Sequence, residues 1–259
     1  MSGFYIGVDG KARKVKGGYI GVDGKARKIK KGYIGDANGV ARLCWSGVDP
    51  VFANNTWEEI AMACQAGAVP DTWAVGDQKT MTIDGTDYVI DIIGKDHDDY
   101  SDGSGKAPLT FQLHDCYNTQ ARMHSSATTS IGWSGCEMRK TTLPAIHAKL
   151  PTAIKTLVKK VNKYTNKSGT LETTQDSLFL LSEMEIYGEI TYSKEGEGTQ
   201  YAYYAAGNSP KKKFEGTVDE YWTRSIYTST GFLIVYPING LTASARADKE
   251  DGIAFAFCF

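Results

Sequence analysis

The sequence predicts an α+β fold made mainly of antiparallel β-structure, with β-hairpin repeats first and a larger domain after them. Three observations carry this prediction. A fourteen-residue unit starts at Tyr5, at Tyr19 and, in a looser copy, at Tyr33. Strand-like runs bounded by Gly, Asp and Asn recur through the rest of the chain. Two stretches, 57–66 and 142–166, carry the signals of helices.

Each repeat is predicted to form a β-hairpin. Asp9-Gly10 and Asp23-Gly24 are the dipeptide of a two-residue type I′ turn, which needs positive φ at both central positions. Such a turn fixes the register of both strands, and the second copy then pairs outward from Val22 and Lys25. The partners predicted in the first copy are Val8 and Lys11, Gly7 and Ala12, Ile6 and Arg13, and Tyr5 and Lys14.

The repeats are predicted to need a partner. A strip of small Gly and Ala side chains on one face buries little apolar area, and an isolated hairpin is marginally stable in water. The third copy has a longer turn at Ala37-Asn38-Gly39, and Leu43, Cys44 and Trp45 replace its lysines. This substitution is typical of a terminal repeat that packs against a following domain. The alternative is an unstructured basic arm.

Charge is divided unevenly along the chain. Residues 1–46 hold ten Lys or Arg residues and three Asp residues, a net charge of +7, against −8 for the remainder. This asymmetry favours docking of the repeats on an acidic protein surface over binding to nucleic acid, for which no recognised motif accompanies the lysines. The predicted assembly residues are Tyr5, Lys11, Arg13, Lys14, Tyr19, Lys25, Arg27, Lys28, Tyr33 and Arg42.

Composition excludes several classes of protein. With 259 residues, 41% of them hydrophobic, the chain can bury a substantial core. Five widely spaced cysteines without a CxxC pair indicate reduced, mostly buried thiols in a protein that is made in a cytoplasm. No signal peptide and no membrane span of about 18 apolar residues is expected. No dinucleotide-binding or phosphate-binding glycine motif is present, and we expect no cofactor.

The predicted organisation has three parts: the repeats in 1–47, a linker and short helix in 48–70, and the main domain in 71–259. The helix runs from Trp57 to Ala66 after an Asn55-Thr56 cap and stops at Gly67. A second helical stretch, 142–166, is divided by two prolines, and its solvated face carries Lys155, Lys159, Lys160 and Lys163. Strands are expected at 80–83, 88–93, 109–113, 178–181, 221–225, 231–236 and 252–257.

Candidate binding residues are tyrosines. The glycine-rich and serine-rich region 193–217 contains Tyr201, Tyr203 and Tyr204, and Tyr227 follows it. Tyrosines on irregular loops supply contact area at low entropic cost, so these four are the predicted ligand-binding residues. The alternative is a loop that buries its own aromatic rings.

The sequence offers little evidence for chemistry. Asp96, Asp98, Asp99 and Asp102 are weak candidates for a Ca²⁺ site, because their spacing lacks the EF-hand order. Ser134, in Gly132–Cys136, misses the last glycine of a nucleophile elbow. The histidines lie apart, with no zinc-binding pair. We therefore expect no catalytic residues, no resident metal and no enzyme activity.

Several motifs resemble an uncharacterised domain family of Gram-positive bacteria and their phages, over about residues 71–259. They include Thr72–Asp77, Asp96–Asp98, Gly132–Arg139, Leu178–Glu183 and Tyr221–Ser225. The resemblance implies a divergent C-type-lectin-like fold, although the triplets of calcium-dependent sugar binding are missing. Trp133, Arg139, Trp222 and Arg224 match the family pattern and are interpreted as structural. The opening repeats resemble segments at the start of phage structural proteins.

Together the resemblances imply a phage virion structural protein: a tail or head fibre, collar or decoration component, made in the host bacterial cytoplasm. Its repeats would attach it to other virion proteins or to itself, with a trimer favoured by analogy with spikes. Its lectin-like domain would act in receptor binding, on a host surface glycan or protein. Two alternatives stay open, a cell-wall or capsule polysaccharide hydrolase on the same scaffold and a ligand-free decoration protein.

Overall fold

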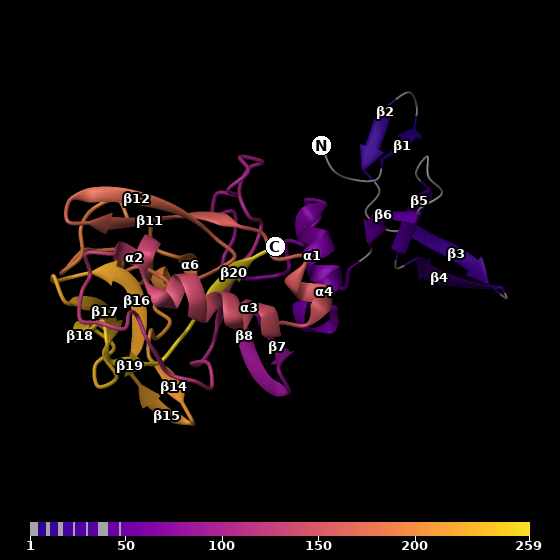
Figure 1. Ribbon diagram of the computed structural model, residues 1–259. Coiled ribbons are helices and arrows are strands. Elements are labelled where there is room, and N and C mark those ends of the chain that lie inside the picture. Colours follow the sequence, from indigo (N-terminus) through magenta and orange to yellow (C-terminus); the bar gives the residue numbers. More distant parts are fainter. Residues whose placement is uncertain are drawn as a thin grey trace. The chain divides into compact units, whose positions relative to one another are not determined.

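The computed structural model describes residues 48–259 and six strands before them (Figure 1). The chain divides into two compact units, residues 1–74 and 75–259, and each is described by itself. The described strands of the repeats are β1 (Tyr5–Val8), β2 (Lys11–Lys14), β3 (Gly18–Val22), β4 (Lys25–Ile29), β5 (Lys31–Gly35) and β6 (Ala41–Ser46), with Gly24 between β3 and β4.

The repeats form three antiparallel hairpins, and the first two have the predicted register. Val8 pairs with Lys11 in the first hairpin, and Val22 pairs with Lys25 in the second. Gly24 has φ = 71°, the left-handed conformation that the type I′ turn requires. In the third hairpin Gly35 pairs with Ala41, and the predicted turn between them lies outside the described residues. All ten predicted assembly residues lie on these strands; of their side chains the structure describes that of Lys25, which is exposed.

A short helical segment completes the first unit. Helix α1 (Trp57–Gln65) begins after Thr56, as predicted, because Thr56 and Glu59 form a reciprocal capping box. Before it lies the single turn η1 (Phe52–Asn54). The ring of Phe52 packs edge-on against Trp57 and Trp73, with centroids 6.1 Å and 5.4 Å away. These aromatic contacts form the apolar centre of the segment.

A five-stranded antiparallel sheet forms the base of the second unit. Its strand order is β13-β20-β9-β8-β7, so the last strand of the chain lies inside the sheet. The strands expected at 80–83 and 88–93 pair as a hairpin, in which Ile83 pairs with Thr86 across Asp84-Gly85. The strands are β7 (Gln78–Ile83), β8 (Thr86–Gly94), β9 (Thr110–Leu113), β13 (Leu178–Phe179) and β20 (Ala256–Cys258).

Smaller antiparallel elements accompany this sheet. The strands β16, β17 and β18 form a three-stranded sheet, while β14 pairs with β15 and β10 with β19. Their bounds are β10 (Ala121–Arg122), β14 (Lys212–Phe214), β15 (Thr217–Asp219), β16 (Tyr221–Ile226), β17 (Gly231–Val235), β18 (Thr242–Arg246) and β19 (Glu250–Asp251).

Short helices connect the strands. They are α2 (Gly132–Gly135), η2 (Met138–Thr142), α3 (Leu143–Lys149), α4 (Thr152–Lys155), α5 (Glu183–Tyr187) and α6 (Ala202–Ala205). No helix among the described residues is long and apolar enough to span a membrane. The predicted α+β class, mainly antiparallel, is confirmed.

One predicted helix is wrong in its second half. Residues 161–166 belong to strand β11 (Val161–Lys167), which pairs with β12 (Thr170–Asp176). Burial alternates along β11, and Lys163, predicted on a solvated helix face, is buried with 2% of its surface exposed. Ser168-Gly169, with φ of 52° and 91°, forms the two-residue turn that the helical spacing of earlier residues concealed.

Candidate functional site

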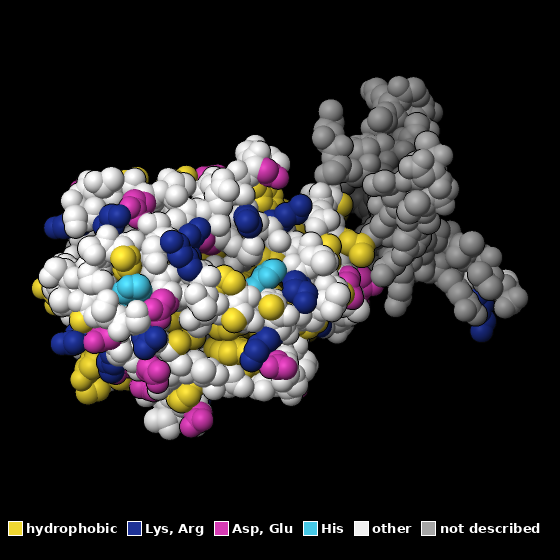
Figure 2. All heavy atoms as spheres, in the orientation of Figure 1, with side chains coloured by type: hydrophobic (Ala, Val, Ile, Leu, Met, Phe, Trp, Pro, Cys, Tyr) yellow, Lys and Arg dark blue, Asp and Glu magenta, His cyan; other side chains and the backbone are white. Residues whose placement is uncertain are grey.

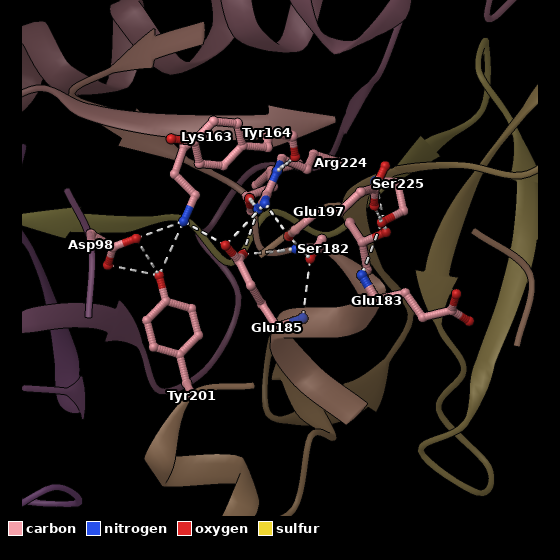
Figure 3. A network of polar contacts seen from close by, with 12 residues as sticks. Asp98, Lys163, Tyr164, Ser182, Glu183, Glu185, Glu197, Tyr201, Arg224 and Ser225 are labelled. Atoms are coloured by element: carbon pink, nitrogen blue, oxygen red, sulfur yellow. Dashed lines mark hydrogen bonds and ion pairs between the residues drawn. The ribbon is translucent and has the colours of Figure 1, made fainter. Parts of the chain in front are cut away.

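A network of buried charged side chains lies inside the second unit (Figure 3). At its centre Arg224, from β16, forms a two-pronged ion pair with Glu185, from α5. Its Nη1 lies 2.5 Å from Glu185 Oε2 and its Nη2 lies 2.9 Å from Oε1. The guanidinium also donates to the main-chain oxygens of Tyr164, Leu180 and Glu197. Arg224 therefore connects four segments at one point.

Local sequence places the Glu185 carboxylate. Ser182 is the N-cap of α5, and its hydroxyl accepts a hydrogen bond from the Glu185 N–H at 3.1 Å. The Glu185 carboxylate in turn accepts a hydrogen bond from the Ser182 N–H at 3.0 Å, and this second bond completes a capping box. The same carboxylate thus fixes the start of the helix and holds Arg224. The Ser-x-x-Glu pattern is the signal in the sequence from which the start of α5 can be predicted.

Lys163 extends the network to a second carboxylate. Its Nζ lies 2.7 Å from Asp98 Oδ1 and 2.5 Å from Glu185 Oε1. The Tyr201 hydroxyl donates to Asp98 Oδ2 at 2.8 Å. The Lys163 ammonium also lies 4.3 Å from the centroid of the Phe179 ring, a cation–π contact. Two cations therefore neutralise two carboxylates in a site without solvent access.

The pKa directions agree with this arrangement. Burial raises the pKa of Asp98, but the Lys163 ammonium outweighs it and lowers that pKa to about 2. Burial likewise opposes ionisation of Glu185, and Arg224 with Lys163 brings the pKa of Glu185 below its usual value. Burial raises the pKa of Glu197 and raises that of Tyr201 well above its usual value. Charge in the network therefore resides on two ion pairs.

The network supports one exposed surface. Glu183, fully buried at the start of α5, accepts hydrogen bonds from the main-chain N–H groups of Tyr192 and Ser193, the latter at 2.8 Å. The Glu183 N–H donates to the Ser225 hydroxyl at 2.9 Å, two residues before Tyr227. Tyr192 and Tyr227 are therefore held from beneath by the same buried group of residues.

These two tyrosines form an exposed aromatic pair. Tyr192 is 40% exposed and Tyr227 is 45% exposed. Their ring centroids are 4.8 Å apart, with an angle of 57° between the planes. The rings come from segments 35 residues apart in sequence, so their contact is a product of the fold. We call Tyr192 and Tyr227 the aromatic pair.

The four predicted ligand-binding tyrosines are not brought together. Tyr201 is completely buried on Asp98, and the Tyr204 hydroxyl donates to Gln112 Oε1 at 2.6 Å inside the domain. Tyr203 is half-buried, with its ring edge-on to Tyr204 at 5.2 Å. Tyr227 is the exposed one, and its partner Tyr192 was missed because no pattern in the sequence marks it. A ligand-binding role for the four remains a prediction.

The residues of the weak metal candidate are engaged separately. Asp98 is buried in the network, whereas Asp99 pairs with Lys106 at 3.2 Å on the surface. Asp102 accepts a hydrogen bond from the Ser104 N–H at 2.9 Å, and Asp96 is exposed. Among the described residues no group of three or more His, Cys, Asp or Glu side chains has the arrangement of a metal site.

The family-matching Trp and Arg residues are structural. Trp133 donates its indole N–H to Asp176 Oδ2 at 2.9 Å, and Arg139 binds Asp176 Oδ1 at 2.6 Å. Trp222 is buried and donates to the Ala121 oxygen at 2.8 Å. The cysteines Cys116, Cys136 and Cys258 are buried and unbridged, and Cys64 is buried. Burial raises the pKa of the Cys116 and Cys136 thiols to about 12, so neither is a reactive thiolate.

A carboxylate–histidine pair lies at the edge of the five-stranded sheet. His114 Nδ1 is 2.9 Å from Asp91 Oδ2, and Gln78 donates to Asp91 Oδ1 at 2.8 Å. Asp91 is buried, whereas 43% of the His114 side chain is exposed. The hydrogen bond to Asp91 raises the pKa of His114 although burial lowers it. No hydrogen bond joins a described Ser, Thr or Cys side chain to this histidine.

Replacing Asp91 with asparagine is expected to lower the pKa of His114 to its ordinary value or below, since burial then acts without the carboxylate. The chemical shift of the imidazole proton, followed by NMR across pH 4–9, measures this change. Asp87→Asn, at an exposed site on the same strand, should leave the titration unaltered. An unshifted titration in Asp91→Asn would contradict the assigned hydrogen bond.

The comparisons with known proteins bear on the second unit. Residues 109–259, more than half of the chain, match the family described as a domain of unknown function, DUF6273. The chain belongs to the DUF6273 family. No curated protein and no solved structure matched the sequence. The DUF6273 segment contains Lys163, Glu185 and Arg224, whereas Asp98 and strands β7 and β8 precede it. Because Asp98 pairs with Lys163, the structural unit extends beyond the N-terminal end of the DUF6273 match.

Proposed function

We propose that this DUF6273 protein is a phage virion structural component that binds a host surface. The aromatic pair carries the proposal: two exposed rings, held by a buried ionic network, provide a rigid surface for recognition. Preorganised aromatic side chains bind partners at low entropic cost. The lectin-like fold implied by the family resemblance agrees with this role, and loops on a rigid scaffold commonly carry binding residues.

The basic hairpins provide the attachment in this proposal. They place lysines at repeated positions along paired strands, such as Lys11 and Lys25, each of which follows a turn. A regular array of positive charge suits an acidic surface on another virion protein or on a second copy of the chain. Figure 2 shows a face of the second unit where basic and acidic side chains are mixed, without a patch of one sign. This mixture does not favour nucleic-acid binding by that face.

A charge-reversal variant of the full chain tests attachment. Lys11, Lys14, Lys25 and Lys28 are changed together to Glu, and we expect at least a tenfold loss of incorporation into particles or of self-association. The matched control changes four exposed lysines of the second unit to Glu: Lys140, Lys159, Lys160 and Lys213. Particle fractionation and light scattering measure the outcome. Equal assembly of both variants would refute the attachment role.

Host binding is tested with the full-length protein on a panel of Gram-positive cells. Fluorescently labelled protein should bind some strains saturably, with binding competed by unlabelled protein. Incubation with cell-wall polysaccharide should release no reducing sugar, because binding and not hydrolysis is proposed. Release of product would support the hydrolase alternative, and absence of binding to every strain would support a ligand-free decoration protein.

A further inference from the structure

The segments that carry the aromatic pair have no charged residue of their own. Residues 190–193 and 226–231 contain no Asp, Glu, Lys or Arg, whereas exposed Glu189 and Lys194, of opposite charge, flank the first segment. Glu183, the carboxylate beneath them, is fully buried and accepts hydrogen bonds from the main-chain N–H groups of Tyr192 and Ser193. The segments that bear the rings therefore present no charged side chain to an ionic ligand, and the charges of the two flanking residues sum to zero.

Three hydroxyl-bearing residues follow Tyr227 in the chain. Thr228, Ser229 and Thr230 are exposed and follow Tyr227 directly. Their loop is anchored, because Thr129 donates to the main-chain oxygens of Thr228 and Ser229 at 2.6 Å and 2.9 Å. An anchored loop of neutral donors and acceptors that directly follows an exposed ring suits a ligand with both hydroxyl groups and C–H faces.

The size of the surface also limits the ligand. Two tyrosine rings with a short hydroxyl-bearing loop supply much less area than the roughly 800 Å² per partner of a stable protein interface. Pyranose rings have the required combination: an apolar C–H face that stacks on an aromatic ring and hydroxyl groups at the edge. We propose that the aromatic pair is a binding site for an uncharged glycan, with Thr228 and Thr230 contacting the sugar hydroxyls. This proposal rests on the proposed host-surface function.

The test uses the full chain with single substitutions. Tyr192→Ala and Tyr227→Ala should each weaken binding to neutral oligosaccharides at least tenfold, because each removes a stacking face. Tyr227→Phe keeps the ring and should stay within about threefold of the unchanged protein. Tyr236→Ala removes a tyrosine that is 38% exposed elsewhere on the same unit, and it should bind normally. Calorimetry on a panel of glucans, mannan, galactan and chitin oligosaccharides gives the affinities.

The chemical class of the receptor is tested on cells. Periodate, which cleaves sugar diols, should abolish binding of the wild-type protein, whereas proteinase K should leave it intact. Loss of cell binding after proteinase K but not after periodate would overturn the proposal. So would binding to anionic teichoic acid, measured beside the neutral panel, without binding to any neutral glycan. So would unchanged glycan binding by the Tyr192→Ala/Tyr227→Ala double variant, or no binding of the wild-type protein to any neutral glycan. Cell binding that persists in the double variant refutes this site and leaves the proposed function standing.

Discussion

Replacing Arg224 with methionine is expected to lower the free energy of unfolding of the second unit by about 3–5 kcal/mol. Removal of one partner of a buried ion pair has this cost because it leaves the other charge without compensation. Glu185 would then depend on Lys163 alone, which it already shares with Asp98. Methionine keeps the apolar stem of the side chain, so the loss reflects charge and hydrogen bonding more than packing.

The main-chain oxygens that Arg224 satisfies add to this cost. Those of Tyr164, Leu180 and Glu197 would each lose a hydrogen bond from the guanidinium, and an unsatisfied buried polar group costs about 1–3 kcal/mol. Lysine cannot make the two-pronged contact to Glu185. Arg224→Lys should therefore also be destabilised, although less than Arg224→Met.

Urea unfolding followed by tryptophan fluorescence measures the effect. Arg246→Met is the matched control, because Arg246 pairs with Asp248 on the surface with 69% of its side chain exposed, and we expect a change below about 0.5 kcal/mol. The Arg224→Met/Glu185→Leu double variant should be more stable than Arg224→Met, since it also removes the Glu185 carboxylate that has lost its partner. A loss below about 1 kcal/mol for Arg224→Met would contradict the role of the ion pair.

Local patterns in the sequence predicted the local structure well. The register predicted for the second repeat, with Val22 opposite Lys25, is found, because a two-residue turn sets hairpin register through backbone geometry alone. The capped helix at Trp57 and the strands around Tyr221 and Gly231 also agree with their predicted positions. These features depend on interactions between residues that are close in the sequence, so local sequence patterns are enough to predict them.

The candidate site could not be predicted in the same way. Lys163 has the sequence context of an exposed lysine, and its burial follows only from partners 65 and 22 residues away, Asp98 and Glu185. Tyr201 and Tyr227 are both aromatic residues near polar neighbours, yet one is buried on a carboxylate and the other is exposed. Contacts between segments that are distant in the sequence cause these differences, and residue spacing does not predict such contacts.

A second large effect is expected from the pH dependence of stability at Asp251, on β19. Burial raises the pKa of Asp251 to about 7, with a further contribution from the Glu220 carboxylate, although Lys249 opposes the shift. Lys249 Nζ contacts both carboxylates, and lies 3.0 Å from Asp251 Oδ1. At neutral pH a single ammonium must therefore compensate two acidic groups, one of which is buried.

The sign of the effect follows from where the proton is bound more tightly. The folded protein holds the Asp251 proton more strongly than the unfolded chain does, whose aspartate pKa is about 3.9. This contribution to stability is complete below about pH 4 and is lost as the pH rises to about 7. Because one pKa unit corresponds to about 1.4 kcal/mol, the loss is at most about 4 kcal/mol, and solvent screening at this site reduces it.

Asp251→Asn removes the titrating group. The free energy of unfolding of this variant, relative to that of the wild-type protein, should therefore increase from pH 4 to pH 8. The two proteins should differ little at pH 4, where both are neutral at this position, and the variant should be the more stable at pH 8. Glu250→Gln, at the neighbour on the same strand, removes an exposed carboxylate and should leave the pH dependence unchanged. Urea unfolding at four pH values gives both curves. If the Asp251→Asn and wild-type curves remain parallel, the aspartate is ionised throughout, and Lys249 fully compensates both carboxylates.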